Sequence, residues 1–155
     1  MIKEIHDDLD EAISLVWRVF LEFEAPNYQE EGIEEFKRSI FNKEWVSKKK
    51  FYGYYDNDKL VGVIATNNIN HISLLFVDGN YHKKGIGRKL YNYIRELNNT
   101  GYFEVNSSIF GHEFYKRLGF IDIDSEQCIH GIRFFPMKID FNDEEIIWTI
   151  MESLI

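Results

Sequence analysis

Four cations and two glycines lie between His82 and Lys89 in a chain that is otherwise acidic. The segment reads His-Lys-Lys-Gly-Ile-Gly-Arg-Lys, whereas the whole chain carries a net charge of −8. Gly85 and Gly87 lack a Cβ atom, so the backbone there can approach an anion closely. Beyond Lys89 the apolar residues recur at the spacing of a helix. Because the first N–H groups of a helix lack internal partners and carry a partial positive charge, this segment predicts a phosphate-binding loop.

The residues around these glycines exclude two common phosphate loops. A dinucleotide-binding fingerprint needs a third glycine at position 90, where Leu90 stands. A P-loop needs lysine and then serine or threonine after its last glycine, but Gly87 is followed by Arg88 and Lys89. The loop therefore fits another phosphate ligand, or only a solvated turn with a helix cap.

The elements that must position this loop predict an α/β fold with a mixed sheet. The strand before the loop, 72–77, is rich in β-branched and large apolar residues, as a buried strand requires. Further strands are expected at 1–5, 51–55, 60–66, 102–107, 120–124 and 132–139. Helices are expected at 9–20, 29–42, from 88, at 111–118 and from 142. This alternation of strands and helices is typical of a layered α/β domain.

Size and composition limit the class of protein. The 155 residues, 45% of them apolar, suffice for one domain, which we expect to span 1–155. The net charge argues against nucleic acid as a partner, because phosphate backbones need a broad basic surface. No apolar run approaches the roughly 20 residues that span a bilayer, so no membrane partner is expected. Cys128 is the single cysteine and cannot form an intrachain disulfide, which favours a cytoplasmic location.

Two distant segments together resemble the GCN5-related N-acetyltransferase (GNAT) family. His-Lys-Lys-Gly-Ile-Gly (82–87), after an apolar strand and before a helix, resembles the acyl-CoA pyrophosphate loop Gln/Arg-x-x-Gly-x-Gly/Ala. Val-Asn-Ser-Ser (105–108) and Phe-Tyr-Lys-Arg-Leu-Gly-Phe (114–120) resemble the strand and helix that end in F-Y-x-x-x-G-F, and the hairpin strand at 59–63 also matches. The resemblance covers about residues 1 to 140. It implies a GNAT-like mixed, mostly antiparallel sheet flanked by helices, with the C-terminal helix as an addition.

The resemblance also implies residues that bind acetyl-CoA, the acetyl donor. The end of the strand at 75–77 would hold the pantetheine arm by its backbone groups, and N–H groups of the loop would hold the pyrophosphate. The implied cofactor-binding residues are Leu75, Phe76, Val77, His82, Lys83, Lys84, Gly85, Ile86, Gly87, Arg88, Asn106 and Ser108. The sequence departs from the family at His82, where Gln or Arg is usual, and at Ser108, where many relatives carry Asn. Tyr115 occupies the position of the general acid.

No carboxylate in the sequence identifies itself as the general base. An alkyl ammonium has a pKa near 10.4, so transfer to an amine needs a base or a relay of waters to remove a proton. A phenol stays protonated at pH 7 and can supply a proton to the leaving thiolate. The candidates for the base are Glu22, Glu24, Glu104 and His71. No metal site is predicted, because the segment His-Glu-x-x-Lys at 112–116 lacks the second histidine of a zinc motif.

Two functions are consistent with these residues. The first is an N-acetyltransferase that moves an acetyl group from acetyl-CoA to a primary amine of a small molecule or peptide by direct attack. The second is a CoA-binding regulatory domain that does not transfer the group. The acidic net charge favours a cationic small-molecule acceptor. The apolar stripe at 146–154 predicts a packing or self-association surface, and with it a homodimer.

Overall fold

The computed structural model describes residues 1–141 and 151–152. Most expected elements are present, and two short ones, a helix and a strand, are additional. The helices are α1 (Asp10–Val19), α2 (Glu30–Ile40), α3 (Lys43–Ser47), α4 (Ile86–Leu97) and α5 (His112–Leu118). The strands are β1 (Ile2–Ile5), β2 (Lys49–Asp56), β3 (Lys59–Asn67), β4 (His71–Val77), β5 (Tyr102–Ser107), β6 (Ile121–Asp122), β7 (Gln127–Ile129) and β8 (Ile132–Asp140). A π-helical turn, Phe20–Glu24, and 3₁₀ turns at Ala25–Asn27 and Gly79–Tyr81 complete the set.

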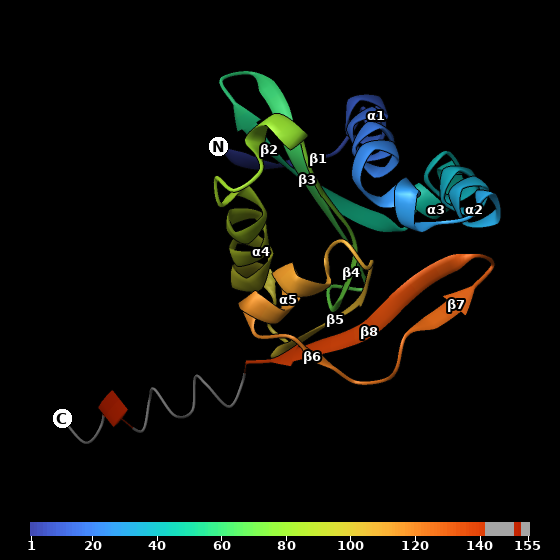
Figure 1. Ribbon diagram of the computed structural model, residues 1–155. Helices are drawn as coiled ribbons and strands as arrows, with labels where there is room; N and C mark the ends of the chain where they lie inside the picture. The colour runs from blue at the N-terminus through green and yellow to red at the C-terminus, as the bar shows by residue number, and fades with distance from the viewer. Residues whose placement is uncertain (142–150, 153–155) are drawn as a thin grey trace.

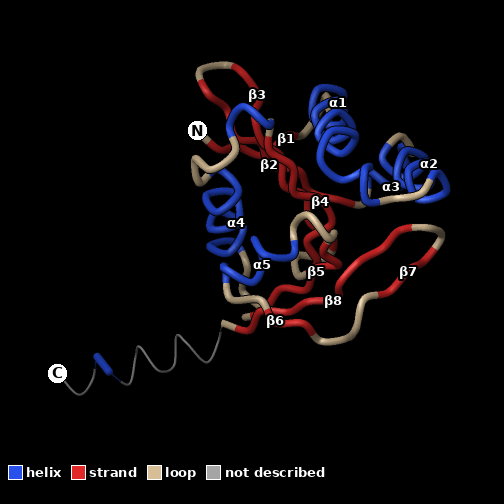
Figure 2. Tube along the Cα trace, viewed as in Figure 1, coloured by secondary structure: helices blue, strands red, loops and turns tan. Residues whose placement is uncertain are grey.

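The strands form one mixed sheet in the order β1-β2-β3-β4-β5-β8-β6, with β7 paired to β8 (Figure 1). Among the described residues only β4 and β5 pair in parallel, and every other neighbouring pair is antiparallel. The expected α/β fold, with a mostly antiparallel sheet flanked by helices, is confirmed. Figure 2 shows the β7–β8 hairpin extending beside α2 and α3.

Helices cover both faces of the sheet, and each face has its own apolar core. One core joins α1, α2 and α3 to inward-facing residues of β2, β3 and β4, among them Phe51, Ala65 and Leu74. The other joins α4 and α5 to residues of the opposite face, among them Ile72 and Val105. In Figure 1 the two groups of helices lie on opposite sides of the strands. The successive strand residues thus alternate between two cores.

The sheet opens between β4 and β5. The two strands pair only at His71 with Glu104 and at Ile72 with Val105, whereas β5 and β8 pair along all of β5. Residues 73–77 of β4 therefore have no strand neighbour on the β5 side. The register of β3 on β4 also skips Ser73, which forms a bulge. Bulges bend a strand and leave one residue outside the ladder. The fold thus leaves backbone groups of β4 available to a ligand.

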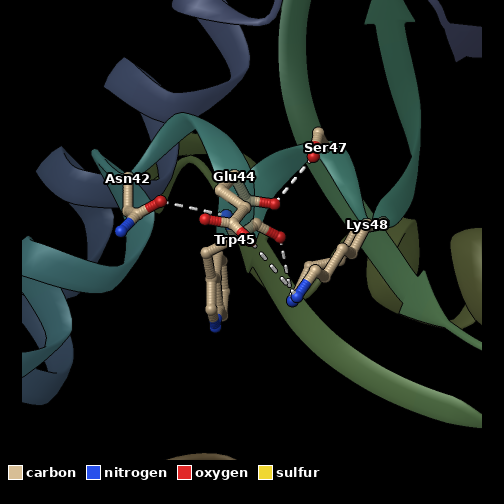
Figure 3. Close-up of polar contacts among 6 residues, drawn as sticks. Asn42, Glu44, Trp45, Ser47 and Lys48 are labelled. Carbon is tan, nitrogen blue, oxygen red and sulfur yellow. Dashed lines mark hydrogen bonds and ion pairs between the residues drawn. The ribbon is translucent and has the colours of Figure 1, made fainter.

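Two expected elements have other bounds in the structure, and two short elements, α3 and β7, were not expected. The helix expected at 29–42 is α2, which ends at Ile40. A separate short helix, α3, begins at Lys43, where the Asn42 side chain accepts a hydrogen bond from the N–H of Trp45 (3.1 Å; Figure 3). The strand expected at 120–124 is shortened to β6, since only its first residues pair with β8. Between β6 and β8 the sequence pattern did not reveal β7. The helix expected from Asn142, with its apolar stripe, lies outside the described residues.

Among the described residues, no helix has the length and apolar character needed to cross a membrane.

Candidate active site

A pocket of about 990 Å³ occupies the opening between β4 and β5. Its wall also includes the π-helical turn, α2, the 82–88 loop, the start of α5 and the β7–β8 hairpin. Nearly all of the predicted site residues line it: Leu75, Phe76, Val77, His82, Lys83, Gly85, Ile86, Gly87, Arg88, Asn106, Ser108 and Tyr115. Lys84 does not, and its Nζ lies 5.0 Å from the centroid of the Tyr81 ring. The structure therefore brings together residues that the sequence places in three separate segments.

The glycine-containing loop presents backbone donors at the end of the pocket near Val77. Gly85 has φ +78°, a left-handed conformation, and a Cβ placed there would meet no atom within 4 Å. The first helical bond of α4 runs from the N–H of Lys89 to the carbonyl of Gly85 (3.0 Å). The N–H groups of residues 86–88 precede that bond and have no partner within the helix. Gly87 lies against a side chain instead, since a Cβ there would lie 3.1 Å from the Phe114 ring, a tight contact.

His82 bonds to the protein rather than projecting freely toward a ligand. Its Nε2 lies 2.7 Å from the carbonyl oxygen of Val77. Its ring also contacts Phe23, with the centroids 4.5 Å apart, and lies 6.2 Å from that of Phe110. This bond holds the loop against the end of β4. The histidine that replaces the usual Gln or Arg thus has a contact within the protein itself.

Glu24 is a buried carboxyl group that faces the pocket from the end of the π-helical turn. Only 9% of the residue is exposed, and this burial raises the pKa of its carboxyl group to about 7. A hydrogen bond from the hydroxyl of Ser108 acts in the opposite direction. The same hydroxyl accepts a bond from the N–H of Gly111 (3.0 Å) at the start of α5. Single π-helical turns are often found at functional sites, and here the turn ends at Glu24.

Tyr115 is a buried phenol on the other wall of the pocket. Its ring packs edge-on against Phe114 and Phe120, with centroid distances of 5.3 and 5.2 Å. Burial is the main cause that raises the pKa of the phenol, and the negative charge of Glu24 raises it further. Tyr115 and Glu24 are thus in electrostatic reach of each other, and the phenol stays protonated at neutral pH.

The structure separates the four candidates for the base. Glu24 and His71 line the pocket, whereas Glu22 and Glu104 are exposed and do not. Burial lowers the pKa of His71. Among the described residues, no group of three or more His, Cys, Asp and Glu side chains is placed to hold a metal ion.

Several pocket residues were not expected from the sequence, among them Ser73 and Tyr28. Ser73 lies at the β4 bulge, which depends on pairing with β3 and has no mark in the sequence of β4 itself. Tyr28 donates a hydrogen bond from its hydroxyl to the carbonyl of Arg133 (3.1 Å), so it joins the turn after α1 to β8. In the sequence, Tyr28 is marked only by the proline turn that comes just before it.

The comparisons with known proteins agree with this geometry. The sequence model of the acetyltransferase (GNAT) domain matches residues 24–141, a segment that runs from Glu24 to the end of β8. The chain belongs to the acetyltransferase (GNAT) domain family. The resemblance found in the loop and in the 114–120 segment is therefore confirmed. No curated protein sequence matches the chain significantly.

Solved structures show the same fold for this GNAT domain. A GCN5-related N-acetyltransferase from Rhodopseudomonas palustris is 17% identical, with a TM-score of 0.78 over 91% of this chain and 95% of its own. PaiA N-acetyltransferase from Thermoplasma acidophilum, in complex with coenzyme A, is 20% identical, with a TM-score of 0.73 over 91% and 99%. An aminoglycoside 6′-N-acetyltransferase complexed with coenzyme A is 16% identical, with a TM-score of 0.59 over 90% and 96%. At these identities the likeness establishes the fold.

Proposed function

We propose that this GNAT domain transfers an acetyl group from acetyl-CoA to a primary amine, with Glu24 as the general base and Tyr115 as the general acid. One observation carries the proposal. A carboxyl group with a pKa of about 7 and a protonated phenol face the same pocket, at the point where β4 and β5 separate. Groups whose environments push their pKa values apart are the usual pair for acid–base chemistry.

The donor is proposed to lie along the open edge of β4. The backbone of residues 75–77 would bind the pantetheine arm as a further strand, and N–H groups of residues 83–88 would bind the pyrophosphate. Asn106 and Ser108 would supply polar contacts from the β5 side. Both were predicted from the sequence, and both line the pocket. The structures of relatives bound to coenzyme A support a CoA ligand for this fold.

The reaction is proposed to proceed by direct attack. Glu24 takes a proton from the ammonium group, the amine nitrogen forms a bond to the thioester carbon, and the carbon–sulfur bond then breaks. A backbone N–H near the Ser73 bulge would stabilise the oxyanion, an interaction that contributes about 3–4 kcal/mol in comparable sites. Tyr115 gives its proton to the leaving thiolate, and the excess proton that remains on the nitrogen returns to the phenolate, directly or through a water molecule. Once Glu24 is neutral, its charge no longer raises the pKa of the phenol, so the first proton transfer assists the second.

Acetyl-CoA consumption across a panel of primary amines tests the proposal. We expect release of free CoA thiol that depends on both substrates, and a product heavier than the amine by one acetyl group in mass spectrometry. Boiled protein and acetyl-CoA without amine are the controls. Calorimetry on the same sample measures CoA binding. Tight CoA binding without turnover on any amine would instead favour the regulatory CoA-binding domain.

A further inference from the structure

The pocket extends past the reacting groups to a row of three polar residues on neighbouring strands. Lys49 of β2 pairs with Asn67 of β3, and Asn67 pairs with His71 of β4. Residues opposite each other in a sheet project from the same face, so the three side chains lie side by side. All three line the pocket. They share the face that carries Phe51 and Ala65, which is the face covered by α1 and α2.

Lys49 has no carboxylate partner among the described residues. Its Nζ lies 3.5 Å from the centroid of the Trp45 ring and donates a hydrogen bond to the Trp45 carbonyl (3.3 Å). Burial lowers the pKa of Lys49, and the positive charge of Lys48 lowers it further. Lys48 itself pairs with Glu44 at 3.8 Å (Figure 3). An ammonium group has three N–H donors, so Lys49 can still donate to an anion in the pocket.

The other charged groups near this end of the pocket already have partners. Glu35 pairs with Arg38, and Arg133 pairs with Glu126 at 2.6 Å. The charge of Glu104 raises the pKa of His71, but Glu104 does not line the pocket. Lys49 is therefore the charged group at this end for which a bound anion would most reduce the free-energy cost of burial.

The position of Lys49 excludes the pyrophosphate as its ligand. From His71 to Val77 is six steps along β4, or about 20 Å at about 3.3 Å per residue, and the phosphate loop begins beyond Val77. The row of Lys49, Asn67 and His71 is thus at the opposite end of the pocket. Between the two ends lie Glu24, Tyr115 and the Ser73 bulge, where the proposed reaction occurs. A ligand at Lys49 would belong to the acceptor.

We propose that the amine acceptor carries a carboxylate, which Lys49 binds with the help of Asn67 and His71. This inference rests on the proposed function. Two residues along β4 and two strand spacings separate Ser73 from Lys49, about 12 Å between backbone atoms. In an α-amino acid only one carbon separates the nitrogen from the carboxylate. Such a molecule cannot span this distance, even when the length of the lysine side chain is subtracted from it. A dipeptide with a free C-terminus or an ω-amino acid has the required length. The local charge at Lys49 thus favours a zwitterionic acceptor, with a carboxylate as well as its amine, whereas the net charge favoured a cationic one.

Matched pairs of acid and amide test this inference. The probes are alanyl-alanine against alanyl-alaninamide, and 6-aminohexanoate against its amide, each with acetyl-CoA. We expect kcat/KM to be about tenfold or more higher for at least one acid than for its amide, because a charge-assisted hydrogen bond is lost in the amide. Lys49→Met should reduce the ratio to near one, mainly through the KM of the acid. Lys50→Met is the control, since it removes the same charge from an exposed residue on the opposite face of β2.

Calorimetric binding of the same four probes to the protein with CoA separates this inference from the proposed function. If no amine is acetylated, an acid preference in Kd that disappears in Lys49→Met would still support the carboxylate site. Equal affinity for acid and amide, failure of both acids to bind, or a preference that survives Lys49→Met would overturn it. If Lys49→Met does not fold, the inference is tested by the unaltered protein alone: a preference for the acid over the amide in kcat/KM or Kd supports the carboxylate site, and no preference overturns it. Acetyl transfer to amides at least as fast as to acids would leave the acetyltransferase function standing and remove the carboxylate site.

Discussion

The hydroxyl of Ser108 donates a hydrogen bond to the carboxylate of Glu24, and so joins the π-helical turn to the loop after β5. The same hydroxyl accepts a bond from the N–H of Gly111, at the start of the helix that carries Tyr115. The proposed base is thereby held relative to the helix of the proposed acid. The family resemblance implies that Ser108 contacts the cofactor, and we propose that its bond to Glu24 makes it a positioning residue as well.

We expect Glu24→Gln to lower kcat by a factor of about 10²–10⁴, because loss of a general base typically has that effect. The pH profile provides the sharper test. With a pKa of about 7, Glu24 must lose its proton to act, so kcat/KM should rise as pH increases toward 7. That rise should be absent in the variant. Glu22→Gln is the control, since Glu22 belongs to the same turn but is exposed and outside the pocket. An identical acid limb in Glu24→Gln and the unaltered protein would assign the base to another group.

The same substitution should stabilise the folded protein above neutral pH. Folding raises the pKa of Glu24 from 4.5 to about 7, so between these values the folded state binds the proton and the unfolded state does not. The free energy of unfolding therefore falls as pH rises from about 4.5 to 7, by about 3 kcal/mol in total. Glutamine is neutral throughout, so Glu24→Gln should exceed the unaltered protein in stability at pH 8 and match it near pH 4.5. Urea unfolding at both pH values measures this difference. Equal stability at pH 8 would mean that the carboxylate is better solvated than its burial indicates.

The fold was largely predictable from local sequence patterns. The glycines and apolar spacing after position 84 mark the start of α4, and the alternation at 102–107 predicts β5 with its observed bounds. Gly119, with φ +108°, ends α5 as a left-handed cap, in agreement with the expected helix at 111–118. These features depend on residues close together in the chain. By contrast, β7 has three residues and owes its pairing to β8.

Site residues could be predicted from the sequence only where they belong to a recognisable motif. The loop and Tyr115 belong to segments with a characteristic order of residues, and both line the pocket. Glu24 could be named only as one of several candidates, because its pKa depends on burial by elements far away in the sequence. Lys49 stands in a run of three lysines at 48–50, and the sequence alone does not distinguish it from its two neighbours. Lys48 and Lys50 are exposed, whereas the pleat of β2 turns Lys49 toward the pocket. That orientation depends on the register of β2 with β3.

Replacing Gly85 with valine should weaken CoA binding strongly while the fold survives. A Cβ at Gly85 would meet no protein atom within 4 Å, so the side chain would occupy the space proposed for the pyrophosphate. The left-handed φ of +78° adds strain of about 1–2 kcal/mol. Gly119→Ala is the control for that strain, because Gly119 is also left-handed but lies outside the pocket. Calorimetry measures CoA affinity for both variants. Unchanged affinity in a folded Gly85→Val protein would place the pyrophosphate elsewhere.

Gly32→Ala should destabilise the protein, although alanine is the better helix residue. In an exposed helix this change stabilises by roughly 0.5–1 kcal/mol. Here a Cβ would lie 2.2 Å from the carbonyl oxygen of Gly131, so α2 and the β7–β8 turn would have to separate, at a cost of about 1–3 kcal/mol. Both elements line the pocket, at the end proposed for the acceptor, so the acceptor KM should rise more than the Kd of CoA. Glu34→Ala, exposed on the same helix, is the control. A higher melting temperature in Gly32→Ala would contradict this prediction and show that the β7–β8 turn can shift away from the added Cβ at little cost.

Tyr115→Phe should abolish most turnover and leave CoA binding nearly normal. The substitution removes the hydroxyl and keeps the ring, so the edge-on contacts with Phe114 and Phe120 should persist. Without the phenol the thiolate must leave unprotonated or wait for water, and loss of a general acid typically lowers the rate by about 10²–10⁴. A compound with a better leaving thiol than CoA should recover part of that loss, whereas a purely structural defect would not discriminate between thiols. Steady-state turnover is to be measured beside CoA affinity and the melting temperature. Full turnover in the variant would remove Tyr115 from the mechanism, and a collapse of folding would identify it as a core residue.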